Sequence, residues 1–180
     1  IAYDDNDLGI DWELPKEDLI ISKADQGHPN FANNINLLWV VMLILVTGAN
    51  GQLGKSIQSF SIQNNISHSF VFTTRDNLDL SCLDEIEYFI EAKKFDLIIN
   101  CAAFTKVDEA EDNQNEATLI NYLAVKKIAQ VAQQRKIKLI HISTDYVFDG
   151  FNSQPYIEND FTNPLNFYGT TKLLGENAIL

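Results

Sequence analysis

The sequence predicts an α/β fold with a doubly wound parallel sheet, and three observations support this prediction. From Leu43 onward, four short apolar runs alternate with amphipathic stretches. Short runs that are apolar throughout are typical of parallel strands covered on both faces, and their alternation with helices indicates right-handed crossovers. A glycine-spaced turn directly follows the first apolar run. All three features lie after residue 41.

The predicted strands are the four apolar runs, at residues 43–46, 69–73, 95–100 and 138–143. Each is short enough for a strand and too short for a buried helix. We expect all four to be covered on both faces, as in a sheet with helices above and below it.

The predicted helices fill the intervals between these strands. The first begins at Leu53. The second has Ser81 and Asp84 at the spacing of a capping box,. The third runs from about residue 107 to 133, with acidic residues in its first turns and basic residues late, as the helix dipole favours,. The fourth begins near Tyr168.

Residues 1–41 have a different character. They hold eight Asp and Glu against two Lys, with Gly, Pro, Asn or Asp every few positions and no sustained helical period. This composition is typical of an acidic, loop-rich tail or linker. Met42, the only methionine, follows it inside an apolar run. We therefore expect two parts, a tail and joint over residues 1–41 and a folded domain over residues 42–180.

The overall charge excludes two classes of partner. The formal net charge is −12 and Lys and Arg form no run, so nucleic acid and anionic membranes would be repelled,. The apolar run 37–46 is about half the length needed to span a bilayer,. We expect a cytoplasmic protein that binds neither nucleic acid nor membrane. His28, His68 and His141 share no ligand spacing, so no metal site is predicted,.

The turn after the first strand, in LILVTGANGQLGKS, carries Gly48, Gly51 and Gly54. The first glycine permits a tight turn, the second lets backbone N–H groups approach a pyrophosphate, and the third lets the helix pack close to the sheet. The start of the following helix would face the anion with its positive dipole end. A strand–turn–helix unit of this kind predicts a Rossmann-type, dinucleotide-binding sheet.

The residues after the second strand bear on the choice of cofactor. An NAD-preferring site usually has an acidic residue there to bind the adenosine ribose, whereas this chain has Thr74 followed by Arg75,. An arginine can pair with a 2′-phosphate, which favours NADPH over NADH. The alternative, that Arg75 is a solvated charge and Asp76 binds the ribose, stays open.

A third motif indicates carbonyl chemistry. Tyr168 and Lys172 are four residues apart and would share one face of a helix,. An ammonium beside a phenol favours the phenolate and tunes Tyr168 as a proton donor to a carbonyl that becomes an alkoxide. Thr144, at the end of the fourth strand, could donate a hydrogen bond to the same oxygen.

With these motifs in place, the chain resembles the extended short-chain dehydrogenase/reductases, and in particular dTDP-4-dehydrorhamnose reductases. The segments ILVTGANGQLG, NCAAFTKVDEAE, STDYVFDG and YGTTKLLGE carry the resemblance, which covers residues 42–180, roughly the nucleotide-binding half of that family. It implies reduction of the C4 ketone of dTDP-4-dehydro-L-rhamnose with NADPH or NADH. It also implies that a C-terminal substrate domain is missing, so that this piece alone would bind cofactor without turnover.

The resemblance assigns roles to individual positions. Tyr168 would be the catalytic acid, Lys172 its partner and Thr144 the donor to the substrate oxygen, with Asp145 and Tyr146 beside the sugar. With the glycine turn, the implied cofactor-binding residues are Gly48, Asn50, Gly51, Gln52, Leu53, Gly54, Thr74, Arg75, Asp79, Leu80, Ala102, Ala103, Phe104, Thr105, Tyr168 and Lys172. Some family members bind a metal through a Glu where this chain has Ser56, which argues against a metal here.

The first 30 residues are similar to the C-terminal tail of dTDP-4-dehydrorhamnose 3,5-epimerases, chiefly through DLGIDW. This similarity implies either a natural fusion with the upstream epimerase or two adjacent reading frames read as one. It assigns no epimerase activity to the chain. A homodimer is a further assembly that the sequence leaves open.

Two other functions stay open beside the reductase. One is another extended-family enzyme, a nucleotide-sugar dehydratase or 4-epimerase, which would recycle its cofactor. The other is a non-catalytic, cofactor-binding regulatory subunit.

Overall fold

The structure, a computed structural model, describes residues 41–180. The expectations for the acidic tail, its similarity to epimerases and a fusion fall on residues 1–40 and so lie outside the described residues. Within residues 41–180, none of the helices combines the length and the apolar character that crossing a bilayer requires.

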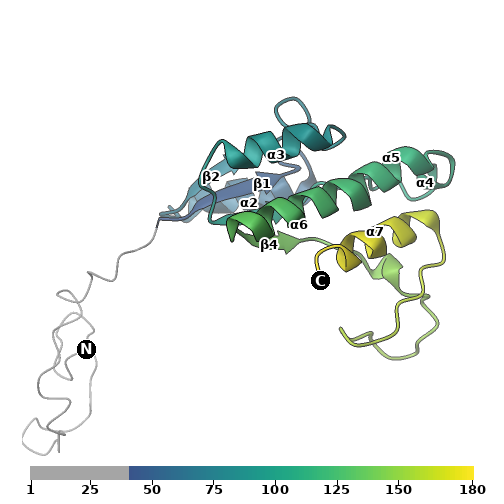
Figure 1. Cartoon of the computed structure of the whole chain (residues 1–180). Helices are drawn as coiled ribbons and strands as arrows, with labels where there is room; N and C mark the ends of the chain where they lie inside the picture. The colour runs from purple at the N-terminus through teal and green to yellow at the C-terminus, as the bar shows by residue number, and fades with distance from the viewer. Residues whose placement is uncertain (1–40) are drawn as a thin grey trace, which may run out of the picture. The chain divides into compact units, whose positions relative to one another are not determined.

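The described residues form a parallel sheet of four strands, which confirms the predicted fold class (Figure 1). The strands run in the order β2-β1-β3-β4, with β1 and β3 in the centre. Their bounds lie within two residues of the predicted ones: β1 is Leu43–Thr47, β2 is Ser69–Phe72, β3 is Leu97–Asn100 and β4 is Lys138–His141. In register, Thr47 lies beside Asn100, and Asn100 beside His141, so the last residues of three neighbouring strands are side by side.

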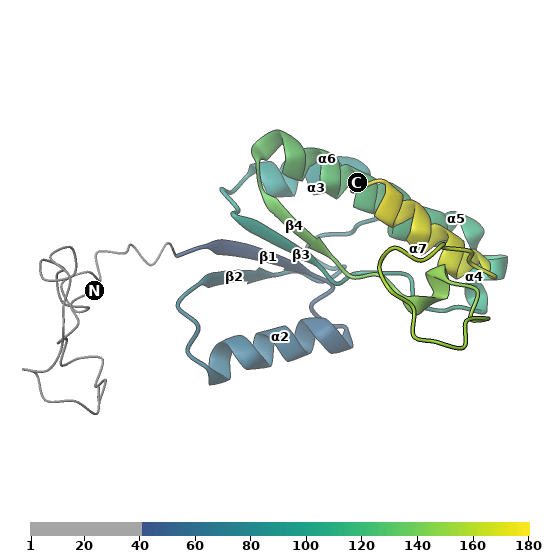
Figure 2. The same cartoon turned by 90° about the horizontal axis from the view of Figure 1, so that it is seen from below.

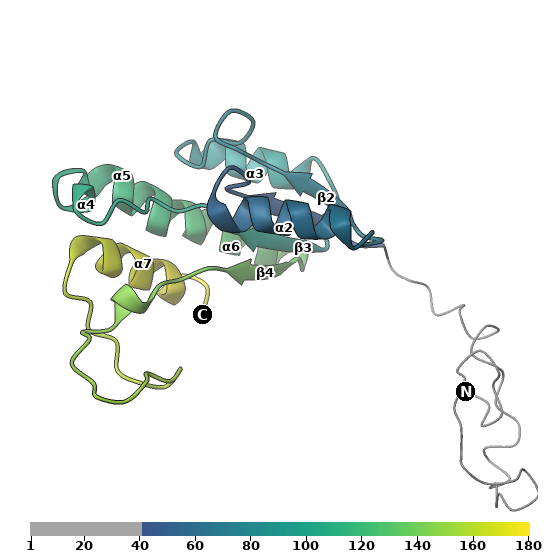
Figure 3. The ribbon, with the colours of Figure 1, turned by 180° about the vertical axis from the view of Figure 1, so that it is seen from behind.

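Helices cover both faces of this sheet. Figure 2 shows α2 on one face and α3 and α6 on the other, and Figure 3 shows α2 from its own side. The helical elements are α2 (Gln52–Gln63), α3 (Leu83–Glu91), α4 (Glu109–Asp112), α5 (Gln114–Thr118), the π-helical turn η3 (Leu119–Leu123), α6 (Ala124–Arg135), the 3₁₀ turn η4 (Asp145–Val147) and α7 (Phe167–Asn177).

The prediction of one helix from residue 107 to 133 is wrong. Asn113 separates α4 from α5, with non-helical backbone angles of φ −107° and ψ 47°. Asparagine offers backbone groups hydrogen bonds outside the helical pattern and is therefore a weak helix former. A second change follows at Leu119–Leu123, where the backbone widens into a π turn before α6. Turns of this kind inside helices often mark functional sites.

The predicted capping box at Ser81 and Asp84 is also wrong. The helix α3 has Cys82 at its N-cap, and no side chain caps it. The Ser81 N–H instead donates to the Asp79 carboxylate at 2.9 Å, so Ser81 belongs to the turn before the helix. The spacing was right for a box, but the chain enters the helix one residue later.

Burial differs between the central and outer strands. Leu45 and Ile98 are fully buried in β1 and β3 and lie in the main apolar core with residues of α3 and α6. In β4, Leu139 packs against this core, whereas Ile140 is 48% exposed. The expectation that every strand is covered on both faces is therefore wrong for β4, because alternate side chains of an outer strand point away from the helix that covers it.

Candidate functional site

A cavity of about 760 Å³ lies where β1, β2 and β3 end. Ligands of open α/β sheets bind at this edge, beyond the carboxyl ends of the strands. The predicted cofactor residues that line the cavity are Gly48, Gly51, Gln52, Leu53, Thr74, Arg75, Asp79, Leu80, Ala102, Ala103 and Thr105. Asn50 and Phe104 belong to the same loops and Gly54 to the first turn of α2, but none of these three lines the cavity, and neither do Tyr168 and Lys172.

The glycine turn is tight in the way its sequence predicts. Gly48 has a φ of +68°, and a Cβ there would lie 2.7 Å from the backbone nitrogen of Ala102. The Gly51 N–H donates to the Gly48 carbonyl at 2.9 Å and closes the turn. A Cβ on Gly54 would lie 2.5 Å from that same carbonyl oxygen, so only glycine lets α2 start this close to β1.

The start of α2 opens on the cavity with features that suit an anion. Gly51 is its N-cap and no side chain caps the helix, and its first turn carries no acidic residue. The first N–H groups of a helix have no partner inside the helix and carry partial positive charge. Gly51, Gln52 and Leu53 all line the cavity. The geometry therefore fits a diphosphate at this end of the cavity.

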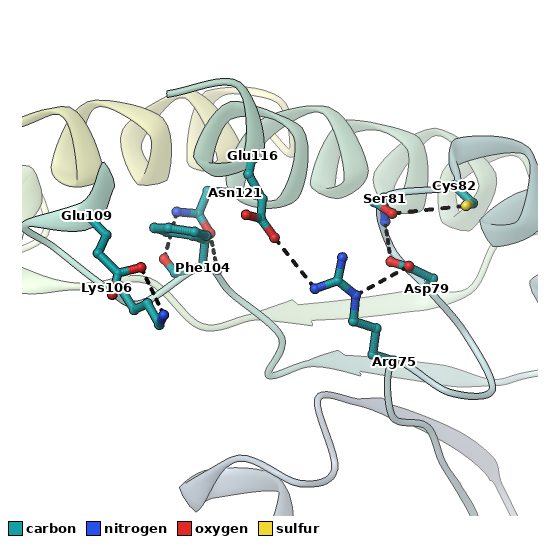
Figure 4. Close-up of polar contacts among 9 residues, drawn as sticks. All are labelled: Arg75, Asp79, Ser81, Cys82, Phe104, Lys106, Glu109, Glu116 and Asn121. Carbon is teal, nitrogen blue, oxygen red and sulfur yellow. Dashed lines mark hydrogen bonds and ion pairs between the residues drawn. The ribbon is translucent and has the colours of Figure 1, made fainter. Parts of the chain in front are cut away.

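Arg75 lies at the rim of the same cavity, held between two carboxylates (Figure 4). Its Nε lies 3.3 Å from an Asp79 oxygen and its guanidinium 3.5 Å from a Glu116 oxygen. The N–H of Ser81 is the main cause that lowers the pKa of the Asp79 carboxyl, and Arg75 adds to it. The arginine is 69% exposed and keeps further donors free for a ligand such as a phosphate,.

The helix α7 carries Tyr168 and Lys172 into the protein interior. The Asn166 side chain caps this helix by accepting the N–H of Gly169 at 2.7 Å. Tyr168 is 8% exposed and Lys172 only 1%. The two share one helix face, as predicted. The side-chain nitrogen of Lys172, however, does not bond the Tyr168 hydroxyl. It donates to the Ile142 carbonyl at 2.6 Å and lies 3.3 Å from Nε2 of His141.

The surroundings of Lys172 shift its own pKa and that of the half-buried His141. Burial lowers the pKa of Lys172 to about 8, and the nearby Glu176 carboxylate opposes this shift. Burial and the charge of Lys172 together lower the pKa of His141 to about 4. His141 is therefore a neutral imidazole near neutral pH.

The predicted substrate residues form a second group, next to Tyr168. Thr144 caps the short turn η4, where its hydroxyl accepts the N–H of Tyr146 at 3.3 Å and donates to Asp145 at 3.2 Å. The ring of Tyr146 meets that of Tyr168 edge to face, with centroids 5.6 Å apart. Asp145 and Tyr146 line a smaller hollow of about 300 Å³. Tyr146 thus lies against Tyr168, but the predicted cofactor-binding residues and the predicted substrate residues line two separate hollows.

Three residues to which the sequence assigned no role in the site lie between these groups. Asn121, in η3, accepts the Phe104 N–H at 2.8 Å and donates to the Phe104 carbonyl at 3.0 Å (Figure 4). It also donates to the Thr171 hydroxyl at 3.1 Å. It ties the loop after β3 to α7. Asn100 and His141, at the ends of β3 and β4, bond to each other at 2.9 Å. In the sequence, each of the three is a polar residue within or at the end of an apolar run, and this pattern could have identified them.

In the part of the chain that the structure describes, no three His, Cys, Asp or Glu side chains are grouped so that they could hold a metal ion. Ser56, where some relatives were expected to have a metal-binding Glu, lies at the wall of the main cavity.

Comparison with known proteins gives a consistent result. The family described as "RmlD substrate binding domain" matches residues 42–180. The dTDP-4-dehydrorhamnose reductase of Burkholderia thailandensis is 42% identical over 77% of this chain and 45% of its own length. The dTDP-4-keto-6-deoxy-D-glucose reductase of Streptomyces niveus is 39% identical over 76% and 46%.

Among solved structures, the dTDP-4-dehydrorhamnose reductase of Bacillus anthracis in complex with NADP is 35% identical, with a TM-score of 0.72 over 77% of this chain and 48% of that one. The chain spans about half the length of the curated relatives it matches.

Proposed function

Because the chain belongs to the RmlD substrate binding domain family, we propose that it is the cofactor-binding part of an NADPH-dependent reductase of a dTDP-linked 4-keto sugar. The substrate we propose is dTDP-4-dehydro-L-rhamnose, reduced at its C4 ketone to dTDP-L-rhamnose. The observation that carries the proposal is the cavity at the strand ends, walled by the glycine turn, the start of α2 and Arg75. The name of the Burkholderia thailandensis relative supports the sugar, and the names of both relatives support the direction of the reaction.

The chain's own groups account for cofactor binding. Backbone N–H groups of Gly51, Gln52 and Leu53 would hold the pyrophosphate at the positive end of α2,. Ala102 and Ala103, small residues after β3, would leave room for the ribose on the nicotinamide side. The bound cofactor supplies a hydride to the substrate carbon.

Side chains of α7 and at the start of η4 would act on the ketone oxygen. As the ketone oxygen gains charge, the Tyr168 hydroxyl would donate its proton to that oxygen, and the Thr144 hydroxyl would donate a hydrogen bond to it. Tyr168 is buried beside Tyr146 and so is shielded from bulk water. Lys172 would act as the partner of Tyr168 from one helical turn further along α7,.

The proposed preference for NADPH rests on the residues after β2. Thr74 is neutral and Arg75 is exposed at the cavity rim, so no acidic side chain stands at the first of these positions to repel a 2′-phosphate. The NADP complex of the Bacillus anthracis enzyme supports this choice. A cytoplasmic location, a homodimer and a fusion to an upstream epimerase remain predictions.

The test is Tyr168→Phe in the full-length protein that contains this chain. We expect the loss of nearly all ketone reduction, measured as cofactor consumed at the nicotinamide absorption band, with little change in NADPH affinity. Tyr88→Phe is the matched control, because Tyr88 is 79% exposed on α3. Reduction that survives Tyr168→Phe, or an equal loss of affinity and turnover, would contradict the role of Tyr168.

The same assay separates the alternatives left open by the sequence. A reductase consumes one cofactor per sugar, whereas a dehydratase or a 4-epimerase regenerates its cofactor. A regulatory subunit would bind NADPH and consume none with the keto sugar present.

A further inference from the structure

The ends of three neighbouring strands are joined by one chain of hydrogen bonds that leads to Lys172. Thr47 ends β1, Asn100 ends β3 and His141 ends β4. The Thr47 hydroxyl donates to the Asn100 side-chain oxygen at 2.5 Å, and the Asn100 side-chain nitrogen lies 2.9 Å from Nδ1 of His141. On the other side of the ring, Nε2 lies 3.3 Å from Nζ of Lys172.

The direction of these hydrogen bonds is determined by a backbone group. The N–H of Ala102 donates to the Asn100 side-chain oxygen at 3.3 Å, and a backbone N–H can only donate,. The oxygen of Asn100 must therefore face Ala102 and Thr47, and its nitrogen must face His141. That nitrogen donates to Nδ1, so Nδ1 carries no proton. A neutral His141 then has its single proton on Nε2.

This tautomer points an N–H donor at Lys172. An ammonium group has three donors and no acceptor, so it cannot accept this N–H. A neutral amine can accept it through its lone pair, and it can still donate to the Ile142 carbonyl, 2.6 Å away. The hydrogen-bond pattern around Nζ is therefore complete when Lys172 is an amine and contains a donor–donor contact when it is an ammonium.

We propose that Asn100 and His141 form a clamp: Asn100 holds the His141 ring so that its Nε2–H points at Nζ of Lys172. This N–H lowers the proton affinity of Lys172. His141 is then a positioning residue that acts through Lys172. When Lys172 becomes the amine that the clamp favours, its proton passes to bulk water.

The other charged groups around α7 do not supply an alternative acceptor for Lys172. Glu176, one turn further along α7, favours the ammonium form and so opposes the clamp. Glu111 of α4 accepts the Phe167 N–H, and Glu116 of α5 pairs with Arg75. Lys172 is 1% exposed, so burial acts in the same direction as the clamp. The remaining titratable groups on α7 and on the elements packed against it are Tyr168, Glu109, Asp112, Tyr122, Asp145 and Tyr146.

The consequence for catalysis rests on the proposed function. A lysine of lowered proton affinity changes its charge close to neutral pH, so the rate of reduction would depend on pH through Lys172. The experiment below measures the clamp without turnover, and its failure is therefore distinguishable from failure of the reductase proposal.

The experiment is NMR on the 180-residue chain labelled in histidine and lysine. Long-range ¹⁵N correlations report which ring nitrogen of His141 is protonated, and the ¹³Cε shift of Lys172 reports its titration. Above the Lys172 midpoint we expect His141 as the Nε2–H tautomer. In His141→Gln, one amide oxygen can accept from both Asn100 and Lys172, so the Lys172 midpoint should rise by about one pH unit or more. His68→Gln is the matched control and should leave the midpoint unchanged.

Two results would overturn the clamp. One is an Nδ1–H tautomer in the wild-type chain, which needs no variant and so decides the question even if His141→Gln does not fold. The other is a folded His141→Gln whose Lys172 midpoint stays in place or falls. A residue that served only to fill space would leave the midpoint where it is.

Discussion

At the scale of single residues, two carboxylates and the proposed 2′-phosphate compete for the guanidinium of Arg75. Its guanidinium pairs with Asp79 and Glu116, and both pairs are close to solvent. Exposed pairs of this kind contribute about 1 kcal/mol or less, so a doubly charged phosphate can displace them. Glu116 does not line the cavity and is thus a competitor for Arg75 rather than a ligand contact.

Glu116→Gln should therefore increase NADPH affinity several-fold relative to NADH. The reason is that Arg75 loses a carboxylate partner and gains freedom to pair with the 2′-phosphate. Fluorescence titration with both cofactors measures the ratio, and Glu109→Gln, which removes the partner of Lys106, is the control. An unchanged ratio would mean that Arg75 does not contact the 2′-phosphate.

Gly48 is the residue whose backbone the site depends on most directly. Gly48→Ala should lower the thermal midpoint and weaken cofactor binding, because the left-handed φ costs about 1 kcal/mol and the added Cβ meets the Ala102 backbone at 2.7 Å,. Gly150→Ala is an informative control, since Gly150 has φ +73° but open space around it. Equal effects of the two substitutions would show that only φ matters and that the close approach to Ala102 does not.

At the scale of elements, hydrogen bonds from η3 connect the loop after β3, beside the main cavity, to α7, which carries Tyr168. Asn121 bonds both backbone groups of Phe104 and the Thr171 hydroxyl. Gly175 allows this contact, because a Cβ there would lie 2.4 Å from the Asn121 carbonyl. The loop beside the main cavity and the helix with Tyr168 are thus held together by the Asn121 side chain.

Asn121→Leu should destabilise the protein by about 1–3 kcal/mol, since the Phe104 N–H and carbonyl lose their partner while partly buried,. Urea unfolding followed by circular dichroism measures the change. Asn115→Leu, at an exposed position of α5, should stay within about 0.5 kcal/mol,. A similarly small change in unfolding free energy for Asn121→Leu would mean that water satisfies the Phe104 backbone groups in place of the Asn121 side chain.

At the scale of the whole molecule, His141 and Lys172 make the free energy of unfolding depend on pH. The pKa of His141 is about 4 in the folded state against an ordinary value of 6.5, so the unfolded chain binds the proton more tightly. Stability is therefore lost as pH falls from 6.5 to 4. For Lys172, the pKa of about 8 against 10.5 means that stability rises as pH increases from 8 to 10.5,.

His141→Gln should remove the acid part of this dependence. The difference in unfolding free energy between pH 6.5 and pH 4, at most about 3 kcal/mol from His141, should shrink in the variant. Urea unfolding at several pH values measures it, and His68→Gln should keep the wild-type slope. If both variants lose the slope equally, His141 is not its source.

The order of the elements and the place of the glycine turn were predictable because they depend on local pattern. Apolar runs of strand length identified β1 to β4 to within two residues, and the spacing of Gly48, Gly51 and Gly54 marked the turn. The break at Asn113 and the π turn after it were not predicted, since acidic residues early and basic residues late in 107–133 suited one continuous helix,. Likewise, no local pattern showed that Ile140 would be exposed.

The sequence by itself determined the parallel sheet, its glycine turn and the shared helix face of Tyr168 and Lys172, because each follows from a pattern within a few residues. Only the tertiary structure decided what Lys172 contacts. Its partners, Ile142 and His141, are 30 and 31 residues away and come from the end of β4, and their hydrogen bonds lead through Asn100 to Thr47 on β1. Helical spacing sets which face a side chain occupies, whereas packing between distant segments sets which atoms it meets.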